Sequence, residues 1–376
     1  MDAAALPFDD QAMLAGLRPW VECESPTYDA AAVNRCMDLA SIELAEAGAT
    51  IERIAGRMGL GDCVRARFPH RSPSTPGILI LGHMDTVHPI GTLEKLPWRI
   101  EGDRAYGPGL CDMKSGNYAA LEAMRQLKAA GITSKLPVTI LLTSDEEIGS
   151  SSTRELIEQE ASRHSAVLVV EPGLIGNGVV TGRYAIARFK LETIGVPSHA
   201  GVMLKEGRSA IREMARQVAV IEDMTTEDCT FSVGVIHGGQ WVNCVATTCE
   251  GEALSMAKRQ EDLDGGVAAM LGLSGQYGGV TFNVTRTVTR PVWEPDERSL
   301  RLFERAQDLA KGMGQELFHQ SFGGGSDGNF TGAMGIPTLD NLGPCGGGYH
   351  TLHEYIEVPT LSQRGRLLAG LVATLD

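Results

Sequence analysis

An apolar run that ends in His-x-Asp is the feature that most constrains the fold of this chain of 376 residues. Residues 78–81 are Ile, Leu, Ile and Leu, and Gly82, His83, Met84 and Asp85 follow them. Acidic residues or histidine end four later segments, at Asp112, at Glu146 with Glu147, at Glu171 and at His350. Ionisable groups at the ends of buried strands are costly unless they are paired or bind a metal. We therefore expect these residues to share one metal centre.

The residue types agree with a hydrolytic metal site. Imidazole and carboxylate groups bind zinc-like ions in hydrolases, and no cysteine occupies any of these positions. Glu146 and Glu147 are adjacent, so on a regular strand their side chains would point to opposite faces. The sequence Ile148-Gly149-Ser150 predicts that the chain leaves the strand here. One acid can then bind metal while the other takes a proton from water.

Each of these residues also has an ordinary interpretation. Asp112 can cap a helix that begins near Lys114, because Asp is a good N-cap residue. Glu171 precedes Pro172-Gly173 and fits a loop, and paired glutamates are common in solvated turns. The coincidence of all five positions favours the metal site over these alternatives.

These motifs, together with Ser198-His199-Ala200-Gly201 and Gly323-Gly324-Gly325-Ser326-Asp327, resemble the M20 family of metallopeptidases and aminoacylases, and most of all its glutamate carboxypeptidase branch. The resemblance runs from about residue 75 to the C-terminus. It implies two divalent metal ions, with zinc as the first expectation and cobalt or manganese as alternatives. In the roles that it implies, His83 and Glu171 bind one metal, Asp112 bridges both, Glu147 and His350 bind the second, Asp85 orients His83, and Glu146 is the general base.

The resemblance also implies a cis peptide bond between Asp112 and Met113. For the last ligand it favours His350 over His353, because the family ends in a histidine that is followed four residues later by glutamate, here Glu354. The other histidines match no motif, and we interpret them as surface or core residues: His70, His88, His164, His237 and His319.

The order of elements predicts an α/β fold, with a mainly parallel sheet in the catalytic domain and helices on both of its faces. Strands are expected near 77–83, 137–143, 166–170 and 336–340, and helices near 115–130 and 151–160. Between 181 and 290 the pattern changes to alternating strands, such as 185–193 and 281–288, with helices near 207–222 and 260–272. Because the chain is also longer than one core usually supports, we expect a catalytic domain at 1–180 and 291–376 and an inserted α+β domain at 181–290. The resemblance identifies the inserted domain as a lid and dimerisation domain.

Four residues are implied by the resemblance to act on the substrate. His199 would stabilise the oxyanion of the tetrahedral intermediate, while Asn243, Arg290 and the backbone N–H of Gly325 would hold a terminal carboxylate. An arginine guanidinium binds a carboxylate through two charge-assisted hydrogen bonds. The chain departs from the family at Cys244-Val245-Ala246, where many members have proline.

The expected function is hydrolysis of the amide bond of an N-acyl amino acid, or of a peptide with a free α-carboxylate, with C-terminal glutamate as the first candidate. Deacetylation or deacylation of a small amino acid such as acetylornithine is the alternative. A metal-binding regulatory protein without enzymatic activity is a third interpretation. Glu146 and His199 argue against it, because a binding protein needs neither. The resemblance further implies a homodimer formed through the lid.

Composition argues against other classes. The net charge of −14 opposes binding to nucleic acid or to an anionic membrane surface. No apolar run approaches the roughly 18 residues of a membrane span, and residues 1–10 lack the regions of a secretory signal, so we expect a cytoplasmic enzyme. The 8 cysteines without CxxC spacing indicate reduced thiols rather than a disulfide framework. The glycine-rich residues 322–328 lack the ending of a P-loop, which leaves nucleotide binding a weak alternative.

Overall fold

The computed structural model describes residues 5–376, which form two compact units. Unit 1 comprises the described residues up to Gly182, together with Pro295–Ser321 and Ser326–Asp376, and unit 2 comprises Arg183–Glu294 and Phe322–Gly325. Each unit has a hydrophobic core of its own. Within residues 5–376, no helix is long and apolar enough to cross a membrane.

Unit 1 is built on a six-stranded sheet with the order β1-β2-β6-β3-β7-β15. Its strands are β1 (Thr50–Ile54), β2 (Cys63–Arg67), β3 (Gly77–His83), β6 (Val138–Thr143), β7 (His164–Val169) and β15 (Thr338–Leu339). β3 is parallel to β6 and β7, and β7 is parallel to β15, whereas β2 is antiparallel to β1 and β6. All residues of β3 and β6 are buried, which explains why apolar residues dominate both strands without alternation.

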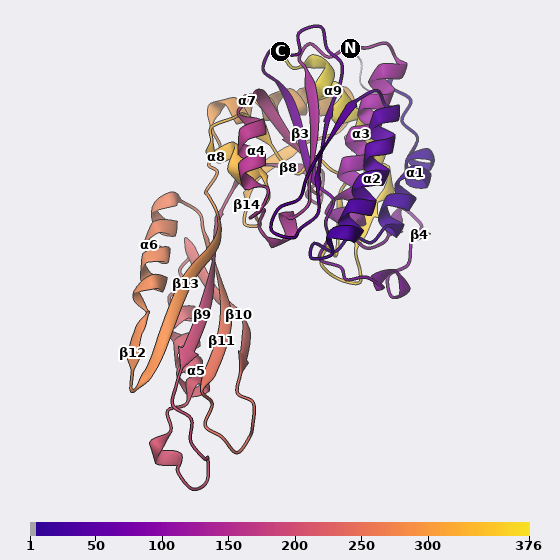
Figure 1. Ribbon diagram of the computed structural model, residues 1–376. Helices are drawn as coiled ribbons and strands as arrows, with labels where there is room; N and C mark the ends of the chain where they lie inside the picture. The colour runs from indigo at the N-terminus through magenta and orange to yellow at the C-terminus, as the bar shows by residue number, and fades with distance from the viewer. Residues whose placement is uncertain (1–4) are drawn as a thin grey trace. The chain divides into compact units, whose positions relative to one another are not determined.

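Helices cover both faces of this sheet (Figure 1). One face shares a core with α1 (Asp10–Glu22), α2 (Ala30–Glu46), α3 (Ser115–Ala129), α7 (Glu297–Gly312) and α9 (Val358–Thr374). The other face packs against α4 (Arg154–Ala161) and α8 (Gly328–Ala333). Successive side chains of a strand point to opposite faces, so Ile78 and Ile80 enter the first core while Leu79 and Leu81 enter the second. The predicted α/β fold is confirmed.

Short strands complete unit 1. An antiparallel sheet with the order β16-β17-β5-β4 contains β4 (Arg99–Glu101), β5 (Arg104–Tyr106), β16 (Gly346–Gly347) and β17 (Tyr355–Glu357). A separate two-stranded sheet pairs β8 (Gly178–Arg183) with β14 (Phe318–Phe322). A 3-10 turn, η2, covers Thr92–Glu94. The antiparallel sheet matters for function because β16 and β17 flank the turn that carries His350.

Unit 2 is a five-stranded antiparallel sheet with two helices on one face (Figure 1). The order is β10-β11-β9-β13-β12, with β9 (Ala185–Ile194), β10 (Cys229–Gly238), β11 (Thr248–Ala257), β12 (Gly275–Tyr277) and β13 (Val280–Arg290). The helices are α5 (Ala210–Glu222) and α6 (Gln260–Gly272), and a 3-10 turn, η5, covers Leu204–Glu206. Every second residue of β9 is buried beneath the helices, which is the alternation expected for a sheet with one covered face.

The strands and helices predicted from the sequence correspond to observed elements, with shifts of a few residues at their ends. The elements α1, α2, β1 and β2 lie outside those predictions. Both helices nevertheless begin with a local signal, because Asp9 accepts hydrogen bonds from the N–H groups of Gln11 and Ala12, and Asp29 accepts one from Ala32. Aspartate is among the preferred N-cap residues.

Candidate metal centre

The carboxyl ends of three parallel strands bring predicted ligands to one edge of the sheet in unit 1. β3 ends at His83, β6 at Thr143 and β7 at Val169. Residues just beyond the ends of parallel strands lie at the same edge, which is where sites of α/β sheets form. His83, Glu146, Glu147 and Glu171 are brought together in this way.

The turn after β6 lets both glutamates reach this edge. Glu146 and Glu147 open a 3-10 turn, η4 (Glu146–Ile148), and Gly149 follows with a φ of 96°. Glycine adopts such a left-handed conformation without steric cost. Two groups of side chains could each hold a metal ion, His83 with Asp112 and Glu147, and His83 with Glu146 and Glu171. In each group the ligand atoms lie within 4.8 Å of one another.

Asp112 enters the site from a turn, η3 (Leu110–Lys114), directly before α3. The peptide bond between Asp112 and Met113 is cis, which confirms the expectation from the resemblance. The N-cap of α3 is Lys114, and no side chain caps this helix. The alternative role of Asp112 as a helix cap is therefore wrong.

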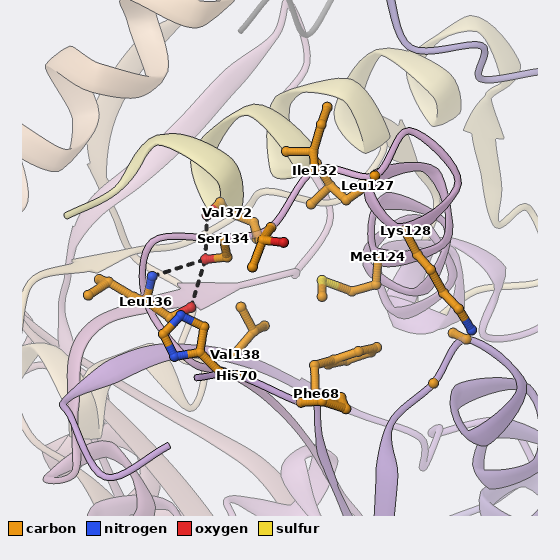
Figure 2. A pocket seen from close by; sticks show the side chains of 15 residues that line it. Phe68, His70, Met124, Leu127, Lys128, Ile132, Ser134, Leu136, Val138 and Val372 are labelled. Atoms are coloured by element: carbon orange, nitrogen blue, oxygen red, sulfur yellow. Dashed lines mark hydrogen bonds between the residues drawn. The ribbon is translucent and has the colours of Figure 1, made fainter. Parts of the chain in front are cut away.

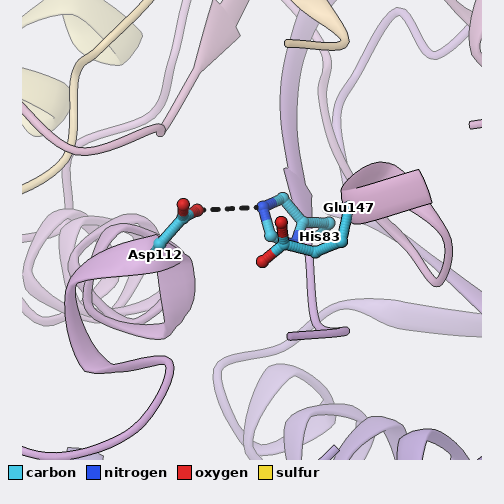
Figure 3. A group of neighbouring side chains, drawn as sticks. All are labelled: His83, Asp112 and Glu147. Carbon is cyan, nitrogen blue, oxygen red and sulfur yellow. Dashed lines mark hydrogen bonds and ion pairs between the residues drawn. The ribbon is translucent and has the colours of Figure 1, made fainter. Parts of the chain in front are cut away.

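Two histidines approach different oxygens of the Asp112 carboxylate. Nε2 of His83 lies 3.2 Å from Oδ1, as Figure 3 shows, and Nε2 of His350 lies 3.3 Å from Oδ2. Nε2 of His83 is also 3.8 Å from Oε1 of Glu171, and Nε2 of His350 is 3.0 Å from Oε2 of Glu147. Asp112 thus stands between two histidine–glutamate pairs, as a carboxylate shared by two ions would.

The two histidines of the C-terminal motif, His350 and His353, differ in their distance from the cluster. The His350 ring lies against Asp112 and Glu147. The side chain of His353 is exposed and forms no ion pair with any residue that the structure describes. The structure therefore brings His350, and not His353, to the cluster.

Asp85 holds both His83 and the turn of the two glutamates. Nδ1 of His83 lies 2.9 Å from the carbonyl oxygen of Asp85 and 3.4 Å from its Oδ1. An oxygen at Nδ1 orients the ring and leaves Nε2 available for a metal. Asp85 also accepts hydrogen bonds from the N–H groups of Glu146 and Glu147, at 3.2 and 3.3 Å, and from Oγ1 of Thr27 at 2.7 Å. The sequence motif predicts only the contact of Asp85 with His83.

The acidic side chains of the site are buried close together, and their pKa values reflect this. Burial, followed by the charge of Asp112, raises the pKa of Glu147 to about 8 and that of Glu171 well above its ordinary value. Burial also opposes charge on Asp112, but hydrogen bonds with His350 and His83 hold its pKa below the ordinary value. Hydrogen bonds with Asp112 and Glu147 raise the pKa of His350 to about 10. The site therefore gathers more negative charge than its histidines balance.

A buried pair, His88 and Glu354, joins three loops of the site, and the sequence interpretation missed its role. Nε2 of His88 lies 2.7 Å from Oε2 of Glu354. The same carboxylate accepts hydrogen bonds from the N–H groups of Gly109, Cys111 and Asp112, at 3.0, 2.7 and 3.0 Å. The pair thus ties the loop after β3 and the turn before β17 to the backbone at Asp112. The only sequence signal is the spacing of the C-terminal motif.

Within unit 2, two of the predicted substrate-binding residues lie on neighbouring segments. The N–H of Ala200 donates a hydrogen bond to the carbonyl oxygen of Asn243 at 2.9 Å, next to His199. Nδ1 of His199 accepts hydrogen bonds from the N–H groups of Gly201 and Val202, at 3.1 and 3.2 Å. A neutral imidazole whose Nδ1 accepts carries its proton on Nε2. The Nε2–H of His199 is therefore the donor that this ring can offer.

The other two predicted residues of unit 2, Arg290 and Gly325, pack against each other. A Cβ atom at residue 325 would lie 2.5 Å from Cδ1 of Ile186 and 2.7 Å from Cδ of Arg290. The absence of a side chain at Gly325 is what leaves room for the stem of Arg290, which is buried. The predicted residues thus form two sets, the metal set in unit 1 and the substrate set in unit 2.

A pocket of about 320 Å³ in unit 1 is not part of the metal cluster (Figure 2). Its walls are mostly apolar and include Phe68, Met124, Leu127, Leu136, Val138 and Val372. Val138 begins β6, whereas the glutamate turn follows the other end of that strand. The pocket therefore opens at the end of the sheet opposite to the ligands, and it contains none of them.

The similarity of the chain to known proteins identifies its family. Residues 79–374 match the profile of peptidase family M20/M25/M40. The chain belongs to the M20 peptidase family. The match confirms the resemblance read from the motifs, and the chain is accordingly a hydrolase of the metallopeptidase type. This removes the support for a regulatory protein without enzymatic activity.

Several M20 proteins are similar over nearly the whole chain. Carboxypeptidase G2 from Pseudomonas sp. (strain RS-16) is 30% identical over 378 residues, which cover 98% of this chain and 90% of the relative. A succinyl-diaminopimelate desuccinylase from Acidovorax ebreus (strain TPSY) is 26% identical over 86% of this chain and 88% of the relative. An M20 family metallo-carboxypeptidase from Sulfolobus solfataricus has the same fold, with a TM-score of 0.76 at 16% identity over 96% of this chain and 98% of that structure.

Proposed function

We propose that this M20 protein is a dinuclear metal-dependent hydrolase that cleaves the amide bond of an N-acyl amino acid or of a peptide with a free α-carboxylate. The observation that carries the proposal is the position of the Asp112 carboxylate between His83 with Glu171 and His350 with Glu147. The names of two relatives support the substrate class, because a carboxypeptidase and a desuccinylase both break an amide bond beside an amino acid.

The donor set fits two divalent cations. His83 and Glu171 would hold one ion, Glu147 and His350 would hold the other, and Asp112 would contribute to both. Oε1 of Glu147 is buried without a hydrogen-bond partner among the described residues, which suits an atom that faces a cation. Nitrogen and oxygen donors without a thiol are typical of hydrolytic zinc, and cobalt or manganese can occupy similar sites. When bound, the ions supply Lewis acidity that activates water and polarises the scissile carbonyl.

Glu146 is the general base in this proposal. Its carboxylate belongs to the group around His83 and Glu171, and its N–H is held by Asp85. Glu146 takes a proton from the attacking water and passes it to the amide nitrogen of the leaving amino acid. Such acid–base catalysis typically contributes about 10²–10⁴-fold to the rate.

His199 stabilises the developing oxyanion. Its Nε2–H is available as a donor because Nδ1 is occupied as an acceptor. A donor aimed at the oxyanion is typically worth about 10²–10³-fold in kcat.

Arg290, Asn243 and Gly325 hold the α-carboxylate of the substrate. The chain has a net charge of −14, so an anionic substrate needs a local cation, and Arg290 is a buried one. The contact between Arg290 and Gly325 lets a guanidinium and a backbone N–H act on one carboxylate. C-terminal glutamate is the first substrate to test, and deacylation of a small amino acid such as acetylornithine is the competing candidate, which the desuccinylase relative favours.

We also infer a homodimer formed through unit 2. Its edge strand β10 exposes Val235 and Ile236, and the following loop exposes 71% of Trp241. Exposed apolar residues on an edge strand favour pairing with another chain. Sedimentation velocity should show a dimer for the natural protein and a smaller species for Ile236→Lys, whereas a monomeric natural protein would contradict the inference.

A substrate screen tests the proposed activity. Protein loaded with Zn²⁺, Co²⁺ or Mn²⁺ is incubated with N-acyl amino acids and dipeptides, and the released amino acid is measured. We expect release from substrates with a free α-carboxylate and much less from their C-terminal amides. Arg290→Ala should raise KM for the acids and change little for the amides. Equal rates for acids and amides, or no release with any of the three metals, would contradict the proposal.

A further inference from the structure

The backbone of His83 extends beyond the strand that flanks it on one side. β7 pairs with β3 only as far as Leu81 and Val169, and the N–H of Val170 donates a hydrogen bond to the carbonyl oxygen of Leu81 at 3.1 Å. Residues two apart in a strand direct their backbone groups to the same neighbouring strand. The N–H and C=O of His83 therefore point to the space beyond the end of β7, where buried backbone groups need other partners.

Two side chains from the segment that follows Asp112 are those partners. The N–H of His83 donates a hydrogen bond to Sδ of Met113 at 3.3 Å, and Nδ2 of Asn117 donates one to the carbonyl oxygen of His83 at 2.6 Å. Met113 directly follows Asp112, and Asn117 lies in the first turn of α3. Both side chains are buried. One proposed ligand, His83, is thus held by the same short segment that carries another, Asp112.

Two glycines allow this close approach. A Cβ atom at residue 82 would lie 2.0 Å from Oδ1 of Asn117 and 3.2 Å from Cε of Met113. A Cβ atom at residue 116 would lie 1.9 Å from the carbonyl oxygen of Val170. Without side chains at Gly82 and Gly116, the start of α3 can lie directly against the ends of β3 and β7. A short amide side chain on the helix then reaches the backbone of the strand.

Packing alone does not explain an asparagine at residue 117. Its Oδ1 is buried and has no hydrogen-bond partner among the residues that the structure describes. A buried polar atom without a partner lowers stability, and a leucine of similar shape would have no such atom. Asparagine instead supplies Nδ2, which donates to the carbonyl oxygen of His83 and, at 3.4 Å, to Sδ of Met84. What it contributes therefore lies at the backbone of the ligand.

We propose that Met113 and Asn117 are positioning residues of the metal centre, which fix the backbone of His83 relative to Asp112. The proposal rests on the proposed function, because it concerns the ions that these ligands would hold. Nε2 of His83 lies 3.2 Å from Oδ1 of Asp112. Asp85 orients the ring of His83, whereas Met113 and Asn117 hold the residue itself in place. Groups that hold ligands in place raise metal affinity.

Metal retention tests the role of Asn117. Asn117→Leu removes the donor and nearly keeps the size of the side chain. Zn²⁺-loaded protein is equilibrated with increasing concentrations of a competing chelator, and the metal that remains bound is measured. The variant should lose its first ion at a free Zn²⁺ concentration about 10–100-fold higher than the natural protein does, the range typical of groups that hold ligands.

Ser115→Ala is the matched control for this variant. Ser115 is buried in the same helix, and its Oγ has no hydrogen-bond partner among the described residues. Its replacement should leave Zn²⁺ retention unchanged. Co²⁺-loaded protein gives a second measurement, because the visible absorption of Co²⁺ depends on the arrangement of its ligands. The spectrum should change in Asn117→Leu and not in Ser115→Ala.

Met113→Leu keeps the proposal testable if Asn117→Leu does not fold. Leucine and methionine replace each other with little loss of stability, so the main loss is the sulfur that accepts the N–H of His83. This variant should also release Zn²⁺ more readily, but by a smaller factor, because a thioether sulfur is a weak acceptor.

The outcomes separate a positioning role from a structural one. Lower stability to urea in the folded variants, with Zn²⁺ retention and the Co²⁺ spectrum of the natural protein, would overturn the proposal. If the variants retain Zn²⁺ less well than a natural protein that hydrolyses no substrate, the proposed function fails and the positioning roles stand. If the natural protein is active and both variants retain metal as it does, the positioning roles fail and the proposed function stands.

Discussion

Nε2 of His350 lies 3.3 Å from Oδ2 of Asp112, so the last histidine of the motif meets the carboxylate that already contacts His83 through its other oxygen. The same nitrogen lies 3.0 Å from Oε2 of Glu147. His350 therefore joins Asp112 and Glu147 in one of the two proposed ligand groups. The relationship makes the choice between His350 and His353 testable.

His350→Ala should lose about half of the bound metal, because one of two ions loses its imidazole ligand. His353→Ala is the matched control, since its side chain is exposed and lies three residues away. Metal content after dialysis, measured by atomic emission, decides between them. A loss confined to His353→Ala would reverse the assignment of the last ligand.

Glu146→Gln should retain both ions but lower kcat by about 10²–10⁴-fold, because an amide of the same shape cannot accept the proton. Metal analysis and steady-state kinetics are measured on the same preparation. Substantial residual turnover, or a missing ion, would show that the base and ligand roles of the two adjacent glutamates are misassigned.

Glu354→Gln should weaken metal binding by about 10–100-fold, because outer residues that orient ligands typically have effects of this size. An amide replaces one of the two oxygens that accept the N–H groups of Gly109, Cys111 and Asp112. Titration calorimetry of the metal-free variant measures the affinity, and His88→Gln is a milder comparison that keeps a donor. Unchanged affinity in Glu354→Gln would mean that the pair supports only packing.

Metal-free protein should become less stable as the pH rises. The pKa of Glu147 is raised from 4.5 to about 8, so between these values the folded state holds more protons than the unfolded state and the free energy of unfolding falls. His350, with a pKa raised from 6.5 to about 10, acts in the same direction, because its stabilisation is complete below 6.5 and is lost towards 10. Urea unfolding of chelator-treated and metal-loaded protein between about pH 5 and pH 9 measures this difference. A metal-free protein that gains stability over that range would contradict the charges assigned to the site.

Local patterns in the sequence predicted the parts of the site that follow strands. β3 and the turn at Glu146 were predictable because their sequence signals are local. A buried apolar run directly precedes His83, and a glycine closes the turn of the two glutamates. The cis bond at Asp112 was predictable only through the family, because nothing local distinguishes it.

Contacts between distant segments were not predictable from one sequence. His88 matches no motif, and its partner Glu354 lies far along the chain, so only the folded chain shows that they meet. The helices α1 and α2 were not predicted, although the aspartates that cap them are visible in the sequence.

His350 is separated along the chain from the other members of the cluster by the segment Arg183–Glu294 of unit 2, and this has a consequence for how the site forms. Asp112 and Glu147 precede that segment, whereas His350 and α9 (Val358–Thr374), which packs on the sheet core, follow it. The contacts of His350 with Asp112 and Glu147 therefore need both sequence segments of unit 1 to fold together. The cluster is a product of long-range folding, and a defect in the packing of the later segment should reach it even though most of its members lie in the earlier one.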